Sequence, residues 1–362
     1  MTTFTRRIMP EVSDAAAQEV FVTSPPLVGI GLPTHNGEPF IAQALQSLLG
    51  QDHRDLDVVV SDNASTDRTP DIVRDFMRRD SRIRHERVED LLTAPQNFNR
   101  AFSLSSGQLF MWAADDDLWD RSYVRRCVAA LADDPIAVMA SSGMRFIDPV
   151  GKVLDADYGR YDNPDLSSRS VVDRVRILLR RGGFYQVYGL AHRDALQRTH
   201  LFQDVYGPDV VLTLELALLG PIVRIPEPLF FYRRFPDRTE AARAERQGGI
   251  ADAADVLTAR MTHLQESLSE AVRGSALPGP TKLRLRAEVL RAAYLDDTPM
   301  RSRTRREVAI RAAAAWRERD PGGILKYTLA WAVEQSRGLP RVGRRSAARA
   351  KRLAARARRR LL

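Results

Sequence analysis

Three consecutive acids, Asp115, Asp116 and Asp117, follow the wholly apolar run 109–114. A short apolar run that stops at turn-forming residues is typical of a buried strand in a parallel sheet. Ligands of such sheets bind beyond the carboxyl ends of the strands, and three carboxylates there form a negative site for a hard cation bound through oxygen. The alternative is an acidic turn that caps the next helix, because Asp is a common N-cap residue.

Two further polar turns follow apolar runs. PTHNGE (33–38) comes after residues 27–32, and SDNASTD (61–67) comes after residues 56–60. The second turn carries acceptors and donors suited to a nucleobase and a ribose, although local turn formation by Asx and Ser or Thr residues explains the same composition. A fourth segment, 207–220, begins a later helix with an acid. Together these segments predict a ligand site at one edge of a sheet.

Alternating strands and helices position these turns. Apolar periodicity predicts strands at 27–32, 56–60, 82–88, 109–114 and 136–140, and helices at 40–49, 69–76, 95–105 and 122–131. Further on it predicts helices at 170–181 and 209–219 and a strand pair near 222–233. Strands that alternate with helices every ~25–30 residues indicate an α/β fold with a doubly wound, mostly parallel sheet.

The chain divides by composition. We expect a flexible N-terminal arm at 1–26 and a main domain at 27–240 that divides into 27–148 and 149–240. The polar stretch 151–169 is predicted to form a loop over the site. Residues 241–340 read as a helical extension broken at Pro278–Pro280 and Pro321-Gly322, and residues 341–362 as a basic amphipathic tail.

The charge of the chain is concentrated in that tail. The tail holds ten of the 55 basic residues and no acid, which leaves 45 basic against 46 acidic residues elsewhere. The tail is read as a membrane-surface segment, as a solvated tail, or as a nucleic-acid-binding segment, the last being unlikely without a stacking motif.

The redox environment and location follow from similarly simple counts. A single cysteine, Cys127, excludes disulfides and CxxC sites and lies at an expected helix core position. The N-terminus lacks an apolar signal region, and no run reaches the ~18–20 apolar residues of a membrane span. We therefore expect a cytoplasmic protein, docked peripherally on the inner face of the membrane if the tail binds anionic lipid.

Residues 28–120 resemble a family 2 glycosyltransferase of the GT-A fold. The resemblance rests on LPTHNGEPFIAQALQSLLGQ, DVVVSDNASTDRT and NRAFSLSSGQLFMWAADDDLW, in the family's order and spacing. The resemblance extends to about residue 235 through YGLAHRDAL, GPDVVLTLELALLG and IPEPLFFYRR. It implies a nucleotide-sugar half at 27–148 and an acceptor half at 149–240. Each motif alone is weak, whereas their combination is specific.

The resemblance implies roles for particular residues. The acid triplet matches the DXD region, which holds Mg²⁺ or Mn²⁺ against the diphosphate, and because Ala114 stands at the usual first acid, the metal ligands are expected to be Asp116 and Asp117. Trp119 is expected to line the sugar site or to anchor the core. The other expected nucleotide-sugar contacts are Thr34, Asn36, Glu38, Asp62 at the base edge, Asn63, Asp67, Asn99, Asp115 and Asp116.

The expected chemistry is transfer of one sugar to a hydroxyl acceptor with inversion. A carboxylate must take the proton of the attacking hydroxyl, and the resemblance assigns this role to Asp209, with Glu215 as the alternative base and an N-cap as the alternative role for Asp209. A QxxRW motif is absent, which indicates a non-processive enzyme. The expected partners are a nucleotide-sugar donor and a glycan, lipid-linked or cell-envelope acceptor.

Two other functions fit a similar sheet. A nucleotidyltransferase would need a glycine-rich, basic phosphate loop after the first strand, and residues 33–38 contain no Lys or Arg. A non-catalytic nucleotide-sugar-binding scaffold would be expected to lack one of Asp116, Asp117 and Asp209, and all three are present.

Overall fold

The computed structural model describes residues 24–154, 163–181, 185–235 and 253–294. Within these ranges eight strands form one sheet in the order β3-β2-β1-β4-β7-β6-β8-β5. The predictions for residues 1–23, for the middle of the polar loop 151–169, for 241–252 and for everything from 295 on, including the basic tail, lie outside the described residues.

The first four strands run parallel and confirm the predicted alternation. They are β1 (Val28–Thr34), β2 (Leu56–Asn63), β3 (Ile83–Val88) and β4 (Leu109–Trp112). β1 pairs with both β2 and β4, and β2 pairs with β3. Every residue of β1 is buried, as expected for a strand covered by helices on both faces. The polar residues 61–63, predicted as a turn, extend β2.

The other four strands make the sheet mixed. β6 (Met139–Ile147) and β8 (Ile222–Arg233) are parallel to one another. β7 (Leu190–His192) lies antiparallel between β4 and β6, and β5 (Leu118–Trp119) is antiparallel to β8. The two short strands β5 and β7 carry no periodic signal and were not predicted. The mostly parallel α/β sheet is confirmed.

The predicted strand pair at 222–233 is wrong, because this segment is the single strand β8. Pro226 and Pro228 lack the N–H that a ladder needs, yet the strand continues past them. The β6–β8 register shifts at this point, from Ser142 opposite Ile225 to Gly143 opposite Pro228. An irregularity of this kind accommodates proline without ending a strand. The strand expected at 136–140 begins at Met139 and runs to Ile147.

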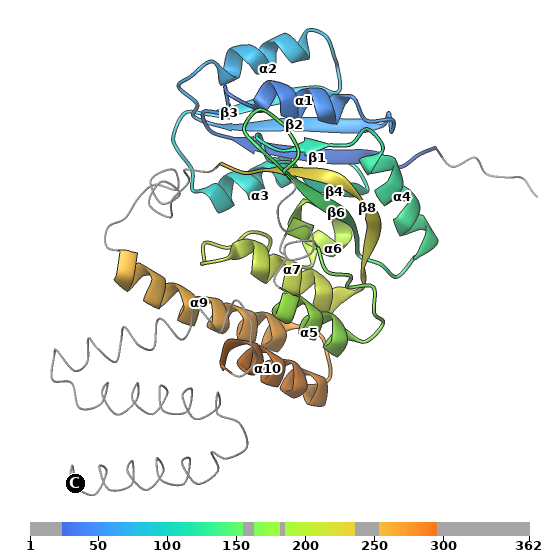
Figure 1. Cartoon of the computed structure of the whole chain (residues 1–362), viewed down its shortest axis with the longest axis vertical. Coiled ribbons are helices and arrows are strands. Elements are labelled where there is room, and N and C mark those ends of the chain that lie inside the picture. The colour runs from blue at the N-terminus through green and yellow to red at the C-terminus, as the bar shows by residue number, and fades with distance from the viewer. Residues whose placement is uncertain (1–23, 155–162, 182–184, 236–252, 295–362) are drawn as a thin grey trace, which may run out of the picture.

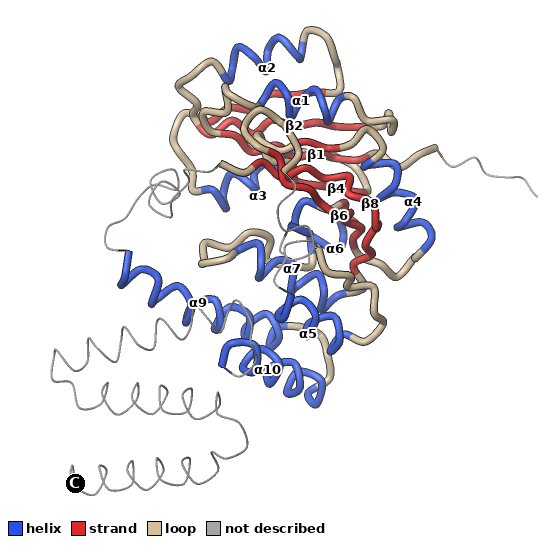
Figure 2. The backbone as a smooth tube through the Cα atoms, viewed as in Figure 1, coloured by secondary structure: helices blue, strands red, loops and turns tan. Residues whose placement is uncertain are grey.

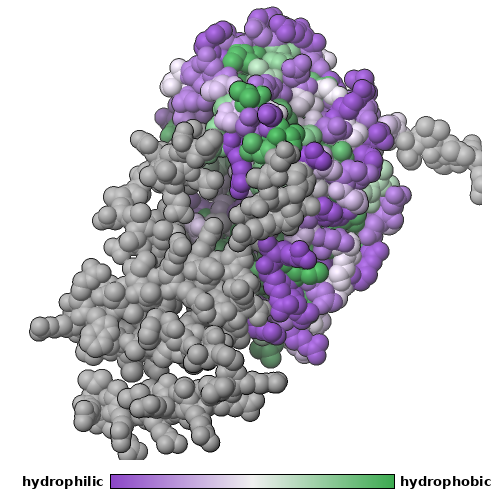
Figure 3. Space-filling model, viewed as in Figure 1, coloured by the Kyte–Doolittle hydropathy of each residue, from purple (hydrophilic) through white to green (hydrophobic). Residues whose placement is uncertain are grey.

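Helices cover both faces of the sheet, as Figures 1 and 2 show. α1 (Ile41–Leu49) and α2 (Thr69–Met77) lie on one face, and α3 (Ala94–Leu104) lies on the other. One core joins α1, α2 and α4 (Tyr123–Asp133) to the sheet and contains Cys127, which is fully buried as expected. The face in Figure 3 is mostly hydrophilic, with hydrophobic residues gathered on its upper part.

A second core lies under the opposite face. It joins α3 to α5 (Val171–Arg181), α6 (Arg193–Gln197) and α7 (Pro208–Leu219), and it extends to α9 (Ala253–Gly274) and α10 (Gly279–Tyr294). Arg176 of α5 lies 3.0 Å from Glu288 of α10, which ties the last helix to the domain. The helices after residue 252 and the break near Pro278–Pro280 agree with the predicted helical stretch. In the described ranges, no helix has the length and apolar content needed to cross a bilayer.

Candidate active site

The predicted donor-binding residues gather at one edge of the sheet. Thr34 ends β1 and is the register partner of Asp62 near the end of β2. The acid triplet follows β4, whose Trp112 is the partner of Gly31 in β1. Because parallel strands end at the same edge, three segments far apart in the sequence meet there.

Thr34 holds the first acid of the triplet. Its Oγ1 donates to Asp115 Oδ2 at 2.5 Å. A Cβ at Gly37 would lie 2.5 Å from Thr34 Oγ1 and 2.6 Å from Asp115 Oδ2. Only glycine therefore lets the turn after β1 pass over this hydrogen bond.

The turns after β1 and β2 are joined through predicted site residues. Asn36, in the left-handed region at φ 54°, accepts from the Thr66 N–H at 2.8 Å through Oδ1. Glu38 Oε2 accepts from the Arg68 N–H at 3.0 Å, and Asp67 Oδ2 accepts from the Glu38 N–H at 3.1 Å. These contacts build the two turns into one rigid rim.

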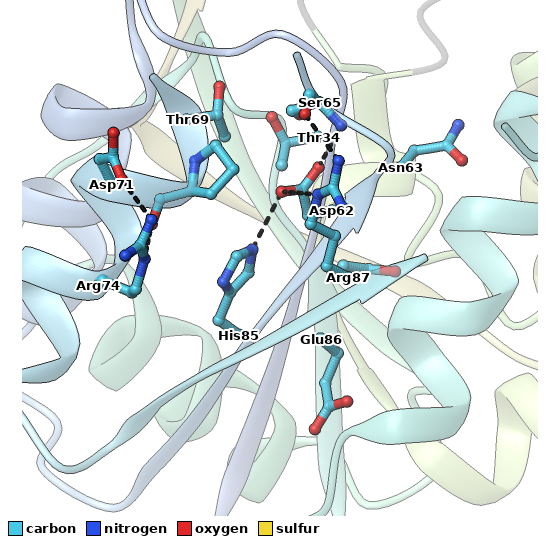
Figure 4. Close-up of polar contacts among 12 residues, drawn as sticks. Thr34, Asp62, Asn63, Ser65, Thr69, Asp71, Arg74, His85, Glu86 and Arg87 are labelled. Atoms are coloured by element: carbon cyan, nitrogen blue, oxygen red, sulfur yellow. Dashed lines mark hydrogen bonds and ion pairs between the residues drawn. The ribbon is translucent and has the colours of Figure 1, made fainter. Parts of the chain in front are cut away.

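Asp62 is fully buried and meets two basic residues that the sequence did not single out (Figure 4). Its Oδ1 accepts from the Ser65 N–H at 2.9 Å, and its Oδ2 lies 3.1 Å from His85 Nε2 and 3.8 Å from Arg87 Nε. Burial alone would raise the pKa of Asp62, but the hydrogen bonds from His85 and Ser65 outweigh it and hold the pKa below its usual value. His85 and Arg87 lie two residues apart on β3 and therefore on the same face of the strand. The alternation of side chains in the segment RIRHERV was the sequence signal that could have paired them.

Two predicted asparagines clamp main chain. The Asn63 amide donates to the Leu92 carbonyl at 2.9 Å and accepts from the Leu92 N–H at 2.7 Å. The Asn99 amide makes the same pair of bonds to Phe202, at 2.8 and 3.0 Å. In the structure Asn99 ties α3 to the loop before α7, and its expected contact with the nucleotide stays a prediction.

The three acids of the triplet differ in environment. Asp115 and Asp116 are partly exposed, whereas Asp117 is fully buried. Asp117 Oδ1 accepts from the Arg233 N–H at 2.8 Å, and its Oδ2 has no hydrogen bond within the described ranges. Burial, and then the negative charge of Asp116, raise the pKa of Asp117 well above its usual range. Because Asp117 is buried and Asp116 is partly exposed, Asp116 is the more accessible of the two expected metal ligands.

Arg233, at the end of β8, was missed by sequence reasoning. Its side chain is 2% exposed, and its Nε donates to the Asp116 carbonyl at 2.6 Å. Its other side-chain donors bind the Asp148 carbonyl at 3.1 Å, the Pro149 carbonyl at 2.8 Å and Gln43 Oε1 at 3.0 Å. The buried guanidinium therefore fixes the main chain of the acid triplet.

The candidate base lies at the start of α7. Gly207, at φ 67°, and Pro208 begin α7, which puts Asp209 in its first turn. Burial raises the pKa of the Tyr188 phenol well above its usual range, and the nearby negative charges of Asp117, Asp116 and Asp209 raise it further. Tyr188 thus lies within electrostatic reach of both the acid triplet and Asp209.

The alternative base, Glu215, is engaged elsewhere. Its carboxylate accepts from the His200 N–H at 2.9 Å and lies 2.5 Å from His200 Nδ1. Six residues of α-helix rotate a side chain by roughly 240° from the first, so Glu215 and Asp209 do not share a face of α7. The geometry favours Asp209 over Glu215 as the base.

Trp119 belongs to the core. It is 4% exposed and its ring lies 5.5 Å from that of Phe230, its partner across β5 and β8. This burial beside Phe230 agrees with the core-anchor alternative, and the role at the sugar site stays untested.

The acid triplet fits a divalent cation that a ligand helps to hold. In the described part of the chain, no three His, Cys, Asp or Glu side chains enclose a metal site by themselves. Mg²⁺ commonly takes only one or two carboxylates and completes its shell with substrate phosphates and water. Asp116 supplies hard oxygen donors of that kind, and Oδ2 of the neighbouring Asp117 makes no hydrogen bond in the described ranges.

Comparison with known sequences gives a family. Residues 30–182 match the model described as Glycosyl transferase family 2. An uncharacterized glycosyltransferase of Nostoc sp. is 24% identical over 218 residues, which are 57% of this chain and 64% of that protein. The GalNAc(5)-diNAcBac-PP-undecaprenol beta-1,3-glucosyltransferase of Campylobacter jejuni is 30% identical over 93 residues, 25% of this chain and 30% of that protein. Both matches span less than two thirds of the relative.

Two solved structures share the fold. S. aureus TarS 1–349 in complex with UDP-GlcNAc aligns with a TM-score of 0.59 at 15% identity, over 86% of this chain and 91% of that one. Mannosyltransferase PcManGT from Pyrobaculum calidifontis, in complex with GDP-Man and Mn²⁺, aligns with a TM-score of 0.51 at 21% identity, over 86% and 85%. These likenesses confirm the GT-A fold predicted from the sequence.

Proposed function

Because residues 30–182 match the model of glycosyltransferase family 2, we propose that this chain moves a single sugar from a nucleoside-diphosphate sugar to an acceptor hydroxyl, with inversion at the sugar carbon. The observation that supports this proposal is the position of Tyr188. The short 3₁₀ helix that it ends, Tyr185–Tyr188, packs against α7, which carries Asp209, and the charges of Asp116, Asp117 and Asp209 all act on its phenol. An inverting displacement needs the leaving group and the attacking hydroxyl on opposite sides of one carbon. The acid triplet and Asp209, which come from the loop after β4 and from α7, are the two groups that we assign to these two roles.

The donor nucleotide would occupy the edge formed by β1, β2 and β4. Asp62 accepts an N–H of the base, and the rim of Asn36, Glu38 and Asp67 borders the ribose. Asp116 would hold Mg²⁺ or Mn²⁺ together with the diphosphate, and such a cation supplies neutralisation of the charge that develops on the leaving nucleotide. Thr34, at the end of β1, binds the carboxylate of Asp115 through its hydroxyl. This bond holds Asp115 toward the turn after β1.

Asp209 would take the proton of the acceptor hydroxyl as that oxygen attacks. Its place in the first turn of α7 puts its carboxylate near the positive end of the helix dipole. Proton transfer by a positioned side chain contributes roughly 10²–10⁴-fold in rate.

A glycan or lipid-linked acceptor is supported by the Campylobacter relative, whose name includes an undecaprenol-linked glycan. The same proposal includes docking of residues 341–362 on an anionic membrane. Equal binding of anionic vesicles by the full chain and a 1–340 truncation at low salt would contradict the docking.

The test is a thermal-shift screen followed by turnover. UDP-GlcNAc, GDP-mannose, a dTDP-sugar and a CDP-sugar are each added with Mn²⁺, Mg²⁺ or EDTA, because a ligand of the native state raises the melting temperature. We expect one donor class to shift the melting temperature only with metal. No shift by any donor on a folded sample would contradict the proposal and favour a scaffold.

Turnover is then followed as release of the nucleoside diphosphate. Asp209→Asn is compared with Asp204→Asn, a change of the same kind at an exposed position of the preceding loop. We expect loss of release in the first variant and wild-type release in the second.

A further inference from the structure

One tyrosine hydroxyl between the two halves of the site has no hydrogen bond in the described part of the chain. Tyr188 is half-buried at the end of the short 3₁₀ helix η1 (Tyr185–Tyr188). Its main-chain carbonyl accepts from the Tyr123 hydroxyl at 3.0 Å, but no contact is made by its own phenolic oxygen. A phenol that is partly out of water and unpaired is a group that a ligand can satisfy.

The backbone holds this phenol in place. The Gly189 N–H donates to the Gln186 carbonyl at 2.7 Å and closes η1. A Cβ at Gly189 would lie 2.6 Å from the Ala140 carbonyl oxygen, so glycine allows η1 to press against β6. The Tyr188 ring lies 5.5 Å from that of Phe230 in β8. Tyr188 is therefore fixed before any ligand arrives.

Two more half-buried tyrosines stand beside it. The rings of Tyr185 and Tyr232 lie 4.8 Å apart at 62°, and Tyr232 is 6.5 Å from Phe230. Aromatic rings carry a negative face, on which the weakly positive C–H groups of a pyranose pack, while their hydroxyls reach the sugar's own hydroxyls. The mixture of apolar faces and polar tips matches a carbohydrate ring better than a phosphate or a base.

The position of Tyr188 identifies which carbohydrate ring this would be. η1 packs against α7, which carries Asp209, and Tyr188 contacts Phe230, three residues before the Arg233 that binds Asp117. In the function proposed above, the acid triplet faces the diphosphate and Asp209 faces the acceptor. The ring that must lie between them is the sugar being transferred.

Resting on that proposed function, we propose that Tyr188, with Tyr185 and Tyr232 beside it, forms the subsite for the transferred sugar, and that the Tyr188 hydroxyl donates to an oxygen of that sugar. Tyr188 then contributes to the choice among donor sugars. It does not contribute to the choice of nucleotide, which the function proposed above assigns to the edge formed by β1, β2 and β4.

The test compares donors with and without their sugar. Binding of UDP-GlcNAc and UDP, and of GDP-mannose and GDP, is measured by calorimetry with Mn²⁺ for the wild type and for Tyr188→Phe. Loss of one neutral hydrogen bond is expected to weaken the nucleotide-sugar by about fivefold to tenfold. Binding of the sugar-free nucleotide is expected to stay within about twofold of the wild type.

Deoxy donors locate the contact. Donors that lack one sugar hydroxyl are bound to both proteins, and the loss from one of them is expected not to add to the loss from Tyr188→Phe, because the same bond is removed twice. The melting temperature shows whether Tyr188→Phe is folded. If it is not, the inference is still tested by binding of the deoxy donors to the wild type. In that case a wild type that binds every deoxy donor as tightly as the parent overturns the inference.

The remaining outcomes separate this inference from the proposed function. A wild type that binds no nucleotide-sugar contradicts both. A wild type that binds donors, with Tyr188→Phe binding them equally well, overturns only the subsite. Intact donor binding with a raised KM for the acceptor would assign Tyr188 to the acceptor and would also overturn the subsite.

Discussion

The main-chain N–H of Arg233 donates to Oδ1 of the buried Asp117 at 2.8 Å, across 116 residues of sequence. The bond joins the end of β8 to the loop after β4, while the Arg233 side chain holds the neighbouring carbonyl of Asp116 at 2.6 Å. One residue from the later part of the chain thus sets the shape of the acid triplet from the earlier part.

Arg233→Lys is expected to destabilise the protein and to weaken metal binding. A lysine ammonium cannot reach the four acceptors that the guanidinium fork satisfies, so buried carbonyls lose their partners. We expect the free energy of unfolding to fall by about 3 kcal/mol, measured by urea denaturation. Arg234→Lys, the same change one residue on, is the control and is expected to have a smaller effect. Equal stability of both variants would show that the side-chain network does not hold the triplet.

Asp116→Asn and Asp117→Asn are expected to differ. Asp116→Asn removes an ionised ligand and should weaken Mn²⁺ binding in the presence of a nucleoside diphosphate by at least about tenfold. Asp117→Asn replaces a carboxyl whose pKa is already raised by burial and by Asp116, and its amide oxygen can still accept from Arg233. Titration of Mn²⁺ by electron paramagnetic resonance distinguishes them. A larger loss in Asp117→Asn would reverse the assignment.

Asp209→Asn and Glu215→Gln separate catalysis from stability. Asp209→Asn should lower kcat by roughly 10²–10⁴-fold with little change in melting temperature, because it removes a base at a partly exposed position. Glu215→Gln weakens a carboxylate that binds His200 through both oxygens, so it should lower the melting temperature and leave kcat close to the wild-type value. The opposite pattern, with Asp209→Asn within about threefold of the wild type and Glu215→Gln inactive, would make Glu215 the base.

Asp62 is expected to stabilise the fold in a pH-dependent way. Burial raises its pKa, but the contacts with His85 and Ser65 lower it below the unfolded value, so its stabilisation is complete above about pH 4–5, near the unfolded pKa. It is lost as the pH falls through the lower folded pKa. Melting temperatures of the wild type and Asp62→Asn should therefore differ most above pH 5 and converge in acid. Asp90→Asn, at an exposed acid of the loop after β3, should show no such convergence.

The sequence by itself determined the order of strands and helices and the edge at which the site lies. Apolar runs with helical spacing between them predict parallel strands, and the carboxyl ends of parallel strands share one edge. The positions of Thr34, Asp62 and the acid triplet at one edge of the sheet therefore follow from the strand order alone. They do not depend on the contacts that the side chains make. The signal was local and periodic, and the structure agrees with it.

Only the tertiary structure decided what each side chain at that edge contacts. β5 and β7 are two and three residues long, too short for a periodic pattern. Yet η1, just before β7, brings Tyr188 against α7, and β5 places Trp119 beside Phe230 of β8. Asp116 and Asp117 are neighbours of the same residue type, but their environments differ. Asp117 is buried and accepts a hydrogen bond from the Arg233 N–H, whereas Asp116 remains partly exposed. Burial and hydrogen bonding depend on residues more than a hundred positions away, and a local pattern carries no information about them.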